Sequence, residues 1–335
     1  MAWFETLTGF REASPQQVRE NIAVDGVILT SRANGRTMVC GRLETPSLAE
    51  LRDRVRSIGN APGRISVREV VANVQDLHAD APLASSVFQV ASRFNLLEMA
   101  SPSVTPEQGV GIYEHDRTQG PACAIAAGAG TIYRNYFATV NGQTGQTASN
   151  QIDCLADIGE ALGNSHDDLW TMRNGYAVAS QSGLLQISNR LDASSEKERD
   201  DLRKLLRIGI HWNTQVTLQG CRHQVSQCYC SALPVAYGDH PANAWEGFAR
   251  LVLESSYEAT ICAAILNAQE TGNHRLFLTL LGGGAYGNPN DWIISGIERT
   301  LRLYRDFDLD VAIVSFGSPK PFLRPLLDGF ARRSV

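Results

Sequence analysis

The stretch RLFLTLLGGGAYGNPNDWIISGIERTLRLYRDFDLDVAIVSFG, residues 275–317, decides the fold class. Residues 275–281 form an apolar run that is typical of a buried strand, and residues 291–307 have the apolar spacing of an amphipathic helix. A second β-rich apolar run follows at 309–317. Because a strand, a helix and a strand in succession form a parallel unit, the stretch predicts an α/β fold.

A glycine-rich loop joins the first strand of this unit to its helix. Gly282, Gly283 and Gly284 follow the strand directly, and Gly287 and Asn288 lie just beyond them. Glycine lets a ligand approach the main chain closely, and a loop that enters a helix presents unpaired N–H groups to an anion. Phosphate is therefore the expected ligand, although a tight turn without a ligand would use the same residues. The spacing matches neither a Walker loop nor the dinucleotide fingerprint.

Another loop, which precedes the glycine loop in the chain and is called the first loop below, has the opposite character, because it is rich in carboxylates. Glu107, Glu114 and Asp116 lie among glycines and prolines, and Glu98 lies just upstream in LLEMASP. Crowded carboxylates can raise one another's pKa, which suits acid–base work, or bind a cation such as a guanidinium. An exposed acidic loop without a function is the competing interpretation. Thr118 is placed to cap the small-residue helix that we expect at 121–129.

Composition narrows the class of protein. The chain has 335 residues, 43% of them hydrophobic and 19% charged, with a net charge of −5. These values predict a packed globular protein and give no support to binding of nucleic acid. No apolar segment approaches the roughly 20 residues that span a bilayer, and no secretory signal is recognisable, so we expect no membrane partner and a cytoplasmic protein with reduced thiols among its seven cysteines. Cys228 and Cys230 fit one face of a strand, and we expect no metal and no cofactor.

The remaining elements are predicted from apolar periodicity and turn residues. We expect residues 1–90 to be an N-terminal extension packed on the core, and residues 91–335 to form one elaborated domain. The expected strands and hairpins lie at 24–44, 63–74, 95–99, 175–191, 207–218 and 223–237. The expected helices lie at 45–58, 82–94, 121–129, 150–163, 194–207 and 244–272, the last of them closed by Gly272 and that at 150–163 capped by Asn150.

Three segments resemble the macrodomain family. LTLLGGGAYGNPNDWIISGIERTLRLY with LDVAIVSFG is similar to the second half of a macrodomain, and GGGAYGN is similar to the glycine loop of the related poly(ADP-ribose) glycohydrolases. LLEMASPSVTPEQGVGIYEHDRTQGPACA resembles the first catalytic loop of divergent, MavL-type macrodomains, which remove ADP-ribose from arginine. The resemblance implies a three-layer α/β/α fold with a mixed sheet, to which this chain adds N-terminal and central hairpins.

The resemblance also implies an ADP-ribose site. Glu107 and Asp116, joined by Glu98, would be the catalytic carboxylates, and Phe316 would contact the adenine. The remaining ligand-binding residues that the resemblance suggests are Tyr113, Thr118, Gln119, Gly120, Gly282, Gly283, Gly284, Ala285, Tyr286, Gly287 and Asn288. Two family patterns are absent, because EMASP replaces the usual NAAN and no consecutive Gln-Glu-Glu occurs.

The implied function is hydrolysis of ADP-ribosylated protein side chains at ribose C1″. Arginine is the expected linkage, because two carboxylates can hold a guanidinium by charge-assisted hydrogen bonds. The expected partners are ADP-ribose and ADP-ribosylated proteins. Three alternatives stay open: a reader that binds ADP-ribose without cleaving it, an enzyme acting on another nucleotide, and a structural protein with a vestigial site.

Overall fold

A mixed seven-stranded sheet forms the centre of the molecule. The computed structural model describes residues 2–59 and 63–330. The order of the strands is β4-β11-β12-β6-β13-β14-β5, and β11 runs antiparallel to both of its neighbours while β12, β6, β13, β14 and β5 are parallel. The strands are β4 (Arg42–Glu44), β5 (Ser66–Val71), β6 (Val87–Ala91), β11 (Gly209–Gln215), β12 (Gln224–Cys230), β13 (Arg275–Leu278) and β14 (Asp310–Ser315).

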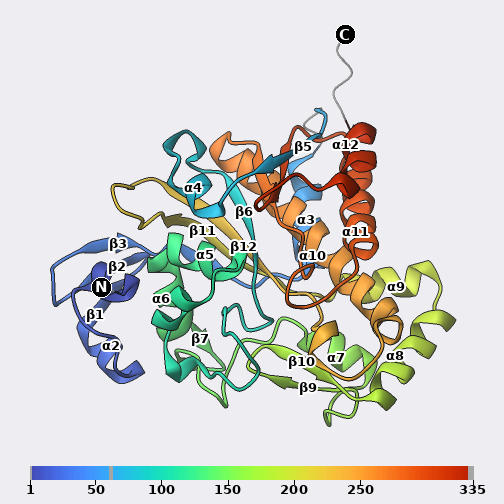
Figure 1. Ribbon diagram of the computed structural model, residues 1–335, viewed down its shortest axis with the longest axis horizontal. Coiled ribbons are helices and arrows are strands. Elements are labelled where there is room, and N and C mark those ends of the chain that lie inside the picture. The colour runs from blue at the N-terminus through green and yellow to red at the C-terminus, as the bar shows by residue number, and fades with distance from the viewer. Residues whose placement is uncertain (1, 60–62, 331–335) are drawn as a thin grey trace.

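Helices cover both faces of this sheet (Figure 1). The helix α10 (Ala242–Thr271) packs on β6, β12 and β13 and also contacts α3 (Leu48–Ile58) and α11 (Asn290–Leu303). On the opposite face lie α4 (Val74–Ala79), α5 (Gln119–Ala126) and α6 (Gly128–Tyr136), with α5 against β6 and α6 against β11. The predicted three-layer α/β/α arrangement with a mixed sheet is therefore confirmed.

Local sequence explains where the principal helices begin and end. In α3 the Ser47 side chain accepts the Glu50 N–H while the Glu50 carboxylate accepts the Ser47 N–H, which satisfies two donors at the helix start. The helix predicted at 45–58 therefore begins at Leu48, three residues later than expected. The 30-residue α10 is apolar on most of its circumference, as expected of a helix buried between the sheet and other helices, and it ends at the predicted Gly272 with φ 73°.

The remaining elements lie at three places: the N-terminal segment, the central segment at 139–203 and a C-terminal helix. The N-terminal segment forms its own small sheet and packs on the first loop and α6 through Phe4, Leu7 and Leu29. These additional elements are α1 (Trp3–Thr8), α2 (Pro15–Asn21), β1 (Ile22–Asp25), β2 (Ile28–Ser31), β3 (Thr37–Val39), β7 (Thr139–Val140), β8 (Gln143–Thr144), α7 (Ala156–Leu162), β9 (Trp170–Arg173), β10 (Tyr176–Ala179), α8 (Gln181–Ala193), α9 (Glu196–Arg203) and α12 (Arg324–Phe330).

Several predicted elements were wrong, and packing explains why. The segment 82–94 is not a helix, because it contains β6, whose residues Val87–Val90 are buried on both faces and so lack the alternation of a half-exposed strand. Residues 95–99 are irregular instead of extended. The hairpin predicted at 175–191 turns at Asn174 and Gly175, and its supposed second strand is α8, capped by Ser180.

Smaller corrections concern helix starts. The helix predicted at 150–163 begins only at Ala156, and Asn150 does not cap it but donates to the Val140 carbonyl at 2.9 Å. The single helix predicted at 121–129 is two helices, α5 and α6, joined at Ala127. Among residues 2–59 and 63–330, no helix has the length and apolar character needed to cross a bilayer.

Candidate active site

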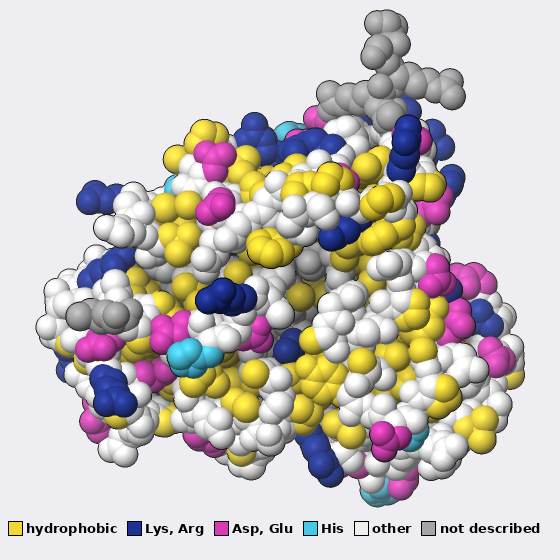
Figure 2. All heavy atoms as spheres, viewed as in Figure 1, with side chains coloured by type: hydrophobic (Ala, Val, Ile, Leu, Met, Phe, Trp, Pro, Cys, Tyr) yellow, Lys and Arg dark blue, Asp and Glu magenta, His cyan; other side chains and the backbone are white. Residues whose placement is uncertain are grey.

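The two loops identified in the sequence leave the same edge of the sheet. β6 and β13 are parallel neighbours, so the segment that begins with Ser92 and the segment that begins with Thr279 both emerge at the carboxyl ends of the strands. Ligands of α/β proteins bind outside this edge. Figure 2 shows that the surface is hollowed near the centre of its view, just above the place where Figure 1 labels β10.

The glycine loop holds its own shape through main-chain hydrogen bonds. Gly283 N–H donates to the Leu280 carbonyl, Gly287 N–H to Gly284 and Asn288 N–H to Gly282, each at 3.0 Å. The Asn288 side chain is buried and donates to the Leu233 carbonyl at 2.9 Å, which ties the loop to the segment after β12. Asn288 therefore acts as an internal anchor of the loop.

Other main-chain groups of the same loop remain available. Within the described part of the chain, the N–H groups of Gly284, Ala285 and Tyr286 make no hydrogen bond. Gly283, Gly284 and Ala285 are exposed, and no atom lies within 4 Å of the position that a Cβ on Gly284 would take. Unpaired N–H groups on an exposed loop are the arrangement that an anion requires.

Gly282 is the position in this loop where glycine is required. Its φ is +75°, and an added Cβ would lie 2.5 Å from the Ala232 Cβ. Both the backbone conformation and the close approach to the segment after β12 exclude a side chain there.

Glu98, the carboxylate nearest the sheet, lies inside the protein. Its side chain is fully buried, and Oε2 lies 3.4 Å from Nη2 of Arg134, itself fully buried. Burial raises the pKa of Glu98, and the opposing charges of Arg134 and Arg93 do not cancel that effect. The Tyr113 hydroxyl accepts the Glu98 N–H at 3.0 Å, so Tyr113 also serves this buried cluster. Neither side chain is open to solvent, because both residues are 1% exposed.

The other carboxylates of the first loop lie at its surface and accept main-chain hydrogen bonds. Glu107 accepts the N–H of Ala148 at 2.8 Å, and Glu114 accepts that of Trp3 at 3.1 Å. Asp116 is partly exposed and accepts the Thr118 N–H at 2.9 Å, just before α5. Thr118 is the N-cap residue of α5 as predicted, but its side chain makes no capping hydrogen bond.

Gln119 and Gly120 join α5 to the end of β6. The Gln119 amide donates to the Gln89 carbonyl and accepts the Ala91 N–H, both at 2.8 Å. An added Cβ on Gly120 would lie 2.0 Å from the Ala91 carbonyl oxygen and 3.3 Å from Glu98 Cγ. These two residues therefore fix the start of α5 against the strand and the buried carboxylate.

Tyr176, which the sequence did not single out, connects the two loops. Its hydroxyl donates to the Met99 carbonyl at 2.8 Å, and its ring centroid lies 5.5 Å from that of Tyr286 in the glycine loop. Tyr176 therefore contacts both the start of the first loop, at Met99, and the middle of the glycine loop, at Tyr286. Phe316 leaves the end of the neighbouring strand β14 and is 76% exposed, so its ring is available to a planar ligand.

Glu12 is a second residue that the sequence did not indicate. Its carboxylate accepts the N–H groups of Val110 at 3.0 Å and Gly111 at 2.6 Å, and the Tyr136 hydroxyl at 2.5 Å. The N-terminal segment therefore shapes the first loop from outside the sheet. The sequence gives little indication of this role, because no local pattern links Glu12 to a loop nearly 100 positions away.

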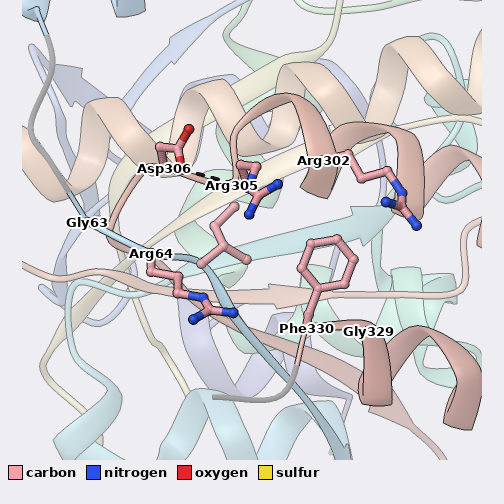
Figure 3. Close-up of a pocket in the computed structure, with 8 residues that line it drawn as sticks. Gly63, Arg64, Arg302, Arg305, Asp306, Gly329 and Phe330 are labelled. Atoms are coloured by element: carbon pink, nitrogen blue, oxygen red, sulfur yellow. Dashed lines mark ion pairs between the residues drawn. The ribbon is translucent and has the colours of Figure 1, made fainter. Parts of the chain in front are cut away.

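Two cavities lie away from the glycine loop. One of about 390 Å³ borders the first loop at Pro102 and the β9–β10 turn at Asn174. Another, of about 270 Å³, lies near the amino ends of β5 and β14, at the opposite edge of the sheet. Figure 3 shows Arg64, Arg302 and Arg305 around this second cavity, with Arg305 3.8 Å from Asp306.

The cysteines and histidines of the described residues do not form a metal site. Cys228 and Cys230 are buried along β12 with their thiols free. No group of three or more His, Cys, Asp or Glu side chains in residues 2–59 and 63–330 is arranged to hold a metal ion.

Comparison with known proteins gives structural similarity only. No family model matches the chain, and no curated protein matches its sequence. Among solved structures, the poly(ADP-ribose) glycohydrolase of Deinococcus radiodurans in complex with ADP-ribose is 11% identical, with a TM-score of 0.43, over 96% of each chain. That of Thermomonospora curvata, bound to the inhibitor ADP-HPD, is 12% identical, with a TM-score of 0.38, over 91% of each chain. Similarity at this level establishes neither a family nor an activity for this chain.

Proposed function

We propose that the protein is a hydrolase that removes ADP-ribose from protein side chains, with arginine as the preferred linkage. The observation that carries the proposal is the glycine loop, in which three consecutive main-chain N–H groups at the carboxyl edge of the sheet are unpaired, two of them in exposed residues. A diphosphate is the anion that such a loop suits. The exposed Phe316 on the neighbouring strand supports an adenine at one end of it.

The chemistry at the other end of the ligand falls to Glu107 and Asp116. Both lie on the first loop, and neither is buried, whereas Glu98 is sealed inside and acts through its charge and through Arg134. Cleavage breaks the bond between C1″ and the guanidine nitrogen, and a water oxygen bonds to C1″ in its place. One carboxylate takes a proton from that water, and the leaving nitrogen gains a proton. Carboxylates also stabilise the positive charge that develops on the ribose.

The test is release of ADP-ribose from ADP-ribosylated arginine. We expect Asp116→Ala and Glu107→Ala each to slow release by about 10²–10⁴-fold, the usual contribution of a general acid or base. Glu270→Ala, at the exposed end of α10, is the matched control and should release ADP-ribose at the wild-type rate. Wild-type turnover in both loop variants would refute the proposed roles of these carboxylates.

A reader that binds ADP-ribose without cleaving it is the second candidate. One observation favours it: Glu107 and Asp116 each already accept a main-chain hydrogen bond, so each has fewer lone pairs free to bind a water molecule or the substrate. Calorimetry with free ADP-ribose, followed by the release assay, separates the two functions. Micromolar binding without release from any modified side chain would identify a reader.

A further inference from the structure

Arg93 lies between the two loops and belongs to neither. It is the second residue after β6, and its guanidinium carbon lies 4.8 Å from the ring centroids of both Tyr176 and Tyr286. Tyr237 completes the cluster, with its ring centroid 5.3 Å from each of the other two tyrosines. The cation therefore lies against two adjacent rings, one from the β9–β10 hairpin and one from the glycine loop.

This guanidinium makes no ion pair with a carboxylate of the described residues. Within residues 2–59 and 63–330, no carboxylate oxygen lies within 4.0 Å of it, and its buried Nε has no hydrogen-bond partner. Aromatic rings attract a cation but do not accept its N–H groups in the plane of the guanidinium. Arg93 as a whole is partly exposed, so a molecule from solvent can reach it.

Arg134, in the same region, differs from Arg93 because each of its guanidinium nitrogens donates a hydrogen bond. Its Nε donates to the Leu96 carbonyl at 3.0 Å, and its other nitrogens donate to the Tyr229 hydroxyl, to Glu98 and to Thr131. Glu98 is thus already engaged by Arg134. Two guanidinium groups face a single buried carboxylate, so this part of the molecule carries an uncompensated positive charge.

The tyrosine above Arg93 offers a second group without a partner. Tyr286 is only 5% exposed, and its hydroxyl makes no hydrogen bond. An oxyanion near Arg93 would accept from the guanidinium and from this hydroxyl. Tyr286 is also one of the residues of the glycine loop whose main-chain N–H is unpaired.

We propose that Arg93 is a specificity-determining residue that binds a phosphate group of the ligand held by the glycine loop. The inference deepens the proposed function and rests on it, because it assumes that the ligand of this edge carries a diphosphate. Contact with the two tyrosine rings restricts the guanidinium before a ligand binds, and a planar guanidinium suits two parallel hydrogen bonds to one phosphate. Charge from Arg93 thereby supplements the neutral N–H groups of the loop.

The experiment measures the affinity of wild type, Arg93→Lys and Arg93→Met for ADP-ribose and for inorganic pyrophosphate by calorimetry. We expect Arg93→Met to weaken both by about 10- to 100-fold, the range for charge-assisted hydrogen bonds. Arg93→Lys should bind with intermediate affinity, because a lysine keeps the charge and loses the bidentate geometry. Arg302→Met, which removes an exposed arginine near the cavity of Figure 3, should bind both ligands as wild type does.

The outcomes distinguish this inference from the proposed function. If Arg93→Met and Arg93→Lys bind ADP-ribose and pyrophosphate as tightly as wild type, the role of Arg93 is refuted while ADP-ribose binding stands. If wild type binds pyrophosphate but not ADP-ribose, the proposed function fails and the anion site remains. Should Arg93→Met not fold, Arg93→Lys decides, and affinity of that variant equal to wild type counts against the proposal.

Discussion

The glycine loop and the first loop leave neighbouring strands, yet they are built in opposite ways. The glycine loop at 282–288 is shaped mainly by its own main chain, and the groups that it offers to a ligand are main-chain N–H groups. The first loop, at 98–118, is held by side chains from distant segments: Glu12 on Val110 and Gly111, and Arg134 on Glu98. One loop is locally encoded, whereas the other depends on the rest of the fold.

This difference predicts how each loop responds to substitution. Changes at distant side chains should damage the first loop and leave the glycine loop intact. Changes inside the glycine loop should weaken ligand binding. They should lower stability only at positions where an added Cβ would contact another segment. The four substitutions below test this contrast, beginning with the largest expected effect on the free energy of unfolding.

Arg134→Met should have the largest effect, about 3–5 kcal/mol of lost stability, because it leaves the buried Glu98 without its partner. The loss should grow as pH rises above 4.5. Burial already raises the pKa of Glu98, and removal of Arg134 raises it further, so the folded variant holds its proton to higher pH than wild type and loses stability over a wider range. Urea unfolding between pH 4.5 and pH 8 measures this.

The control is Arg302→Met, which breaks only a surface pair with Glu298 and should cost less than about 1 kcal/mol at any pH. A loss of similar size in both variants would show that Arg134 is not central to the first loop. A loss that shrinks as pH rises would contradict the assigned pKa direction of Glu98.

Glu12→Ala should cost about 2–3 kcal/mol, because it deprives Val110 N–H, Gly111 N–H and the Tyr136 hydroxyl of their acceptor. Hydrogen exchange should speed up in residues 107–116 and stay unchanged in residues 282–288. Glu20→Ala, which removes an exposed carboxylate of the same N-terminal segment, is the control. If hydrogen exchange in Glu12→Ala speeds up equally in both loops, the first loop does not depend on distant side chains more than the glycine loop does.

The same contrast explains what the sequence could predict. The unit β13–α11–β14 and its glycine loop were recognisable because strand, turn and helix signals follow one another within about 40 residues. Gly272 and the paired strands β11 and β12 were local in the same sense. Where a feature depends on neighbours in the sequence, residue type and spacing were sufficient.

The rest of the site depends on residues that are distant in the sequence. β6 was missed because burial on both faces erases alternation, and with it Arg93 was placed at the end of a helix that does not exist. Tyr176 and Tyr237 reach Arg93 and Tyr286 from two further segments, and no periodicity indicates that meeting. The acidic loop was found, but only tertiary structure separates the buried Glu98 from the surface carboxylates Glu107 and Asp116.

Gly282→Ala should cost about 1–2 kcal/mol from its left-handed backbone alone, and more because the Cβ would lie 2.5 Å from that of Ala232. Gly26→Ala separates the two causes, since Gly26 has a φ of +56° and nothing within 4 Å of its Cβ position. Thermal unfolding of both variants gives the comparison. If Gly282→Ala loses no more stability than Gly26→Ala, the glycine loop does not depend on its contact with the segment after β12.

Gly284→Ala should have the smallest effect on stability, within about 0.5 kcal/mol, because its Cβ position is open and its φ is not left-handed. Affinity for ADP-ribose should nevertheless fall about tenfold, since the methyl group would stand where the ligand approaches the unpaired N–H groups. Gly329→Ala in α12, also with open space at its Cβ, is the control: affinity should not change, and stability should not fall, because alanine favours a helix more than glycine does. Unchanged affinity in Gly284→Ala would mean that the exposed main chain of this loop does not contact the ligand. Lost affinity at wild-type stability would show that this residue acts on ligand binding and not on folding, in the loop that the sequence encodes locally.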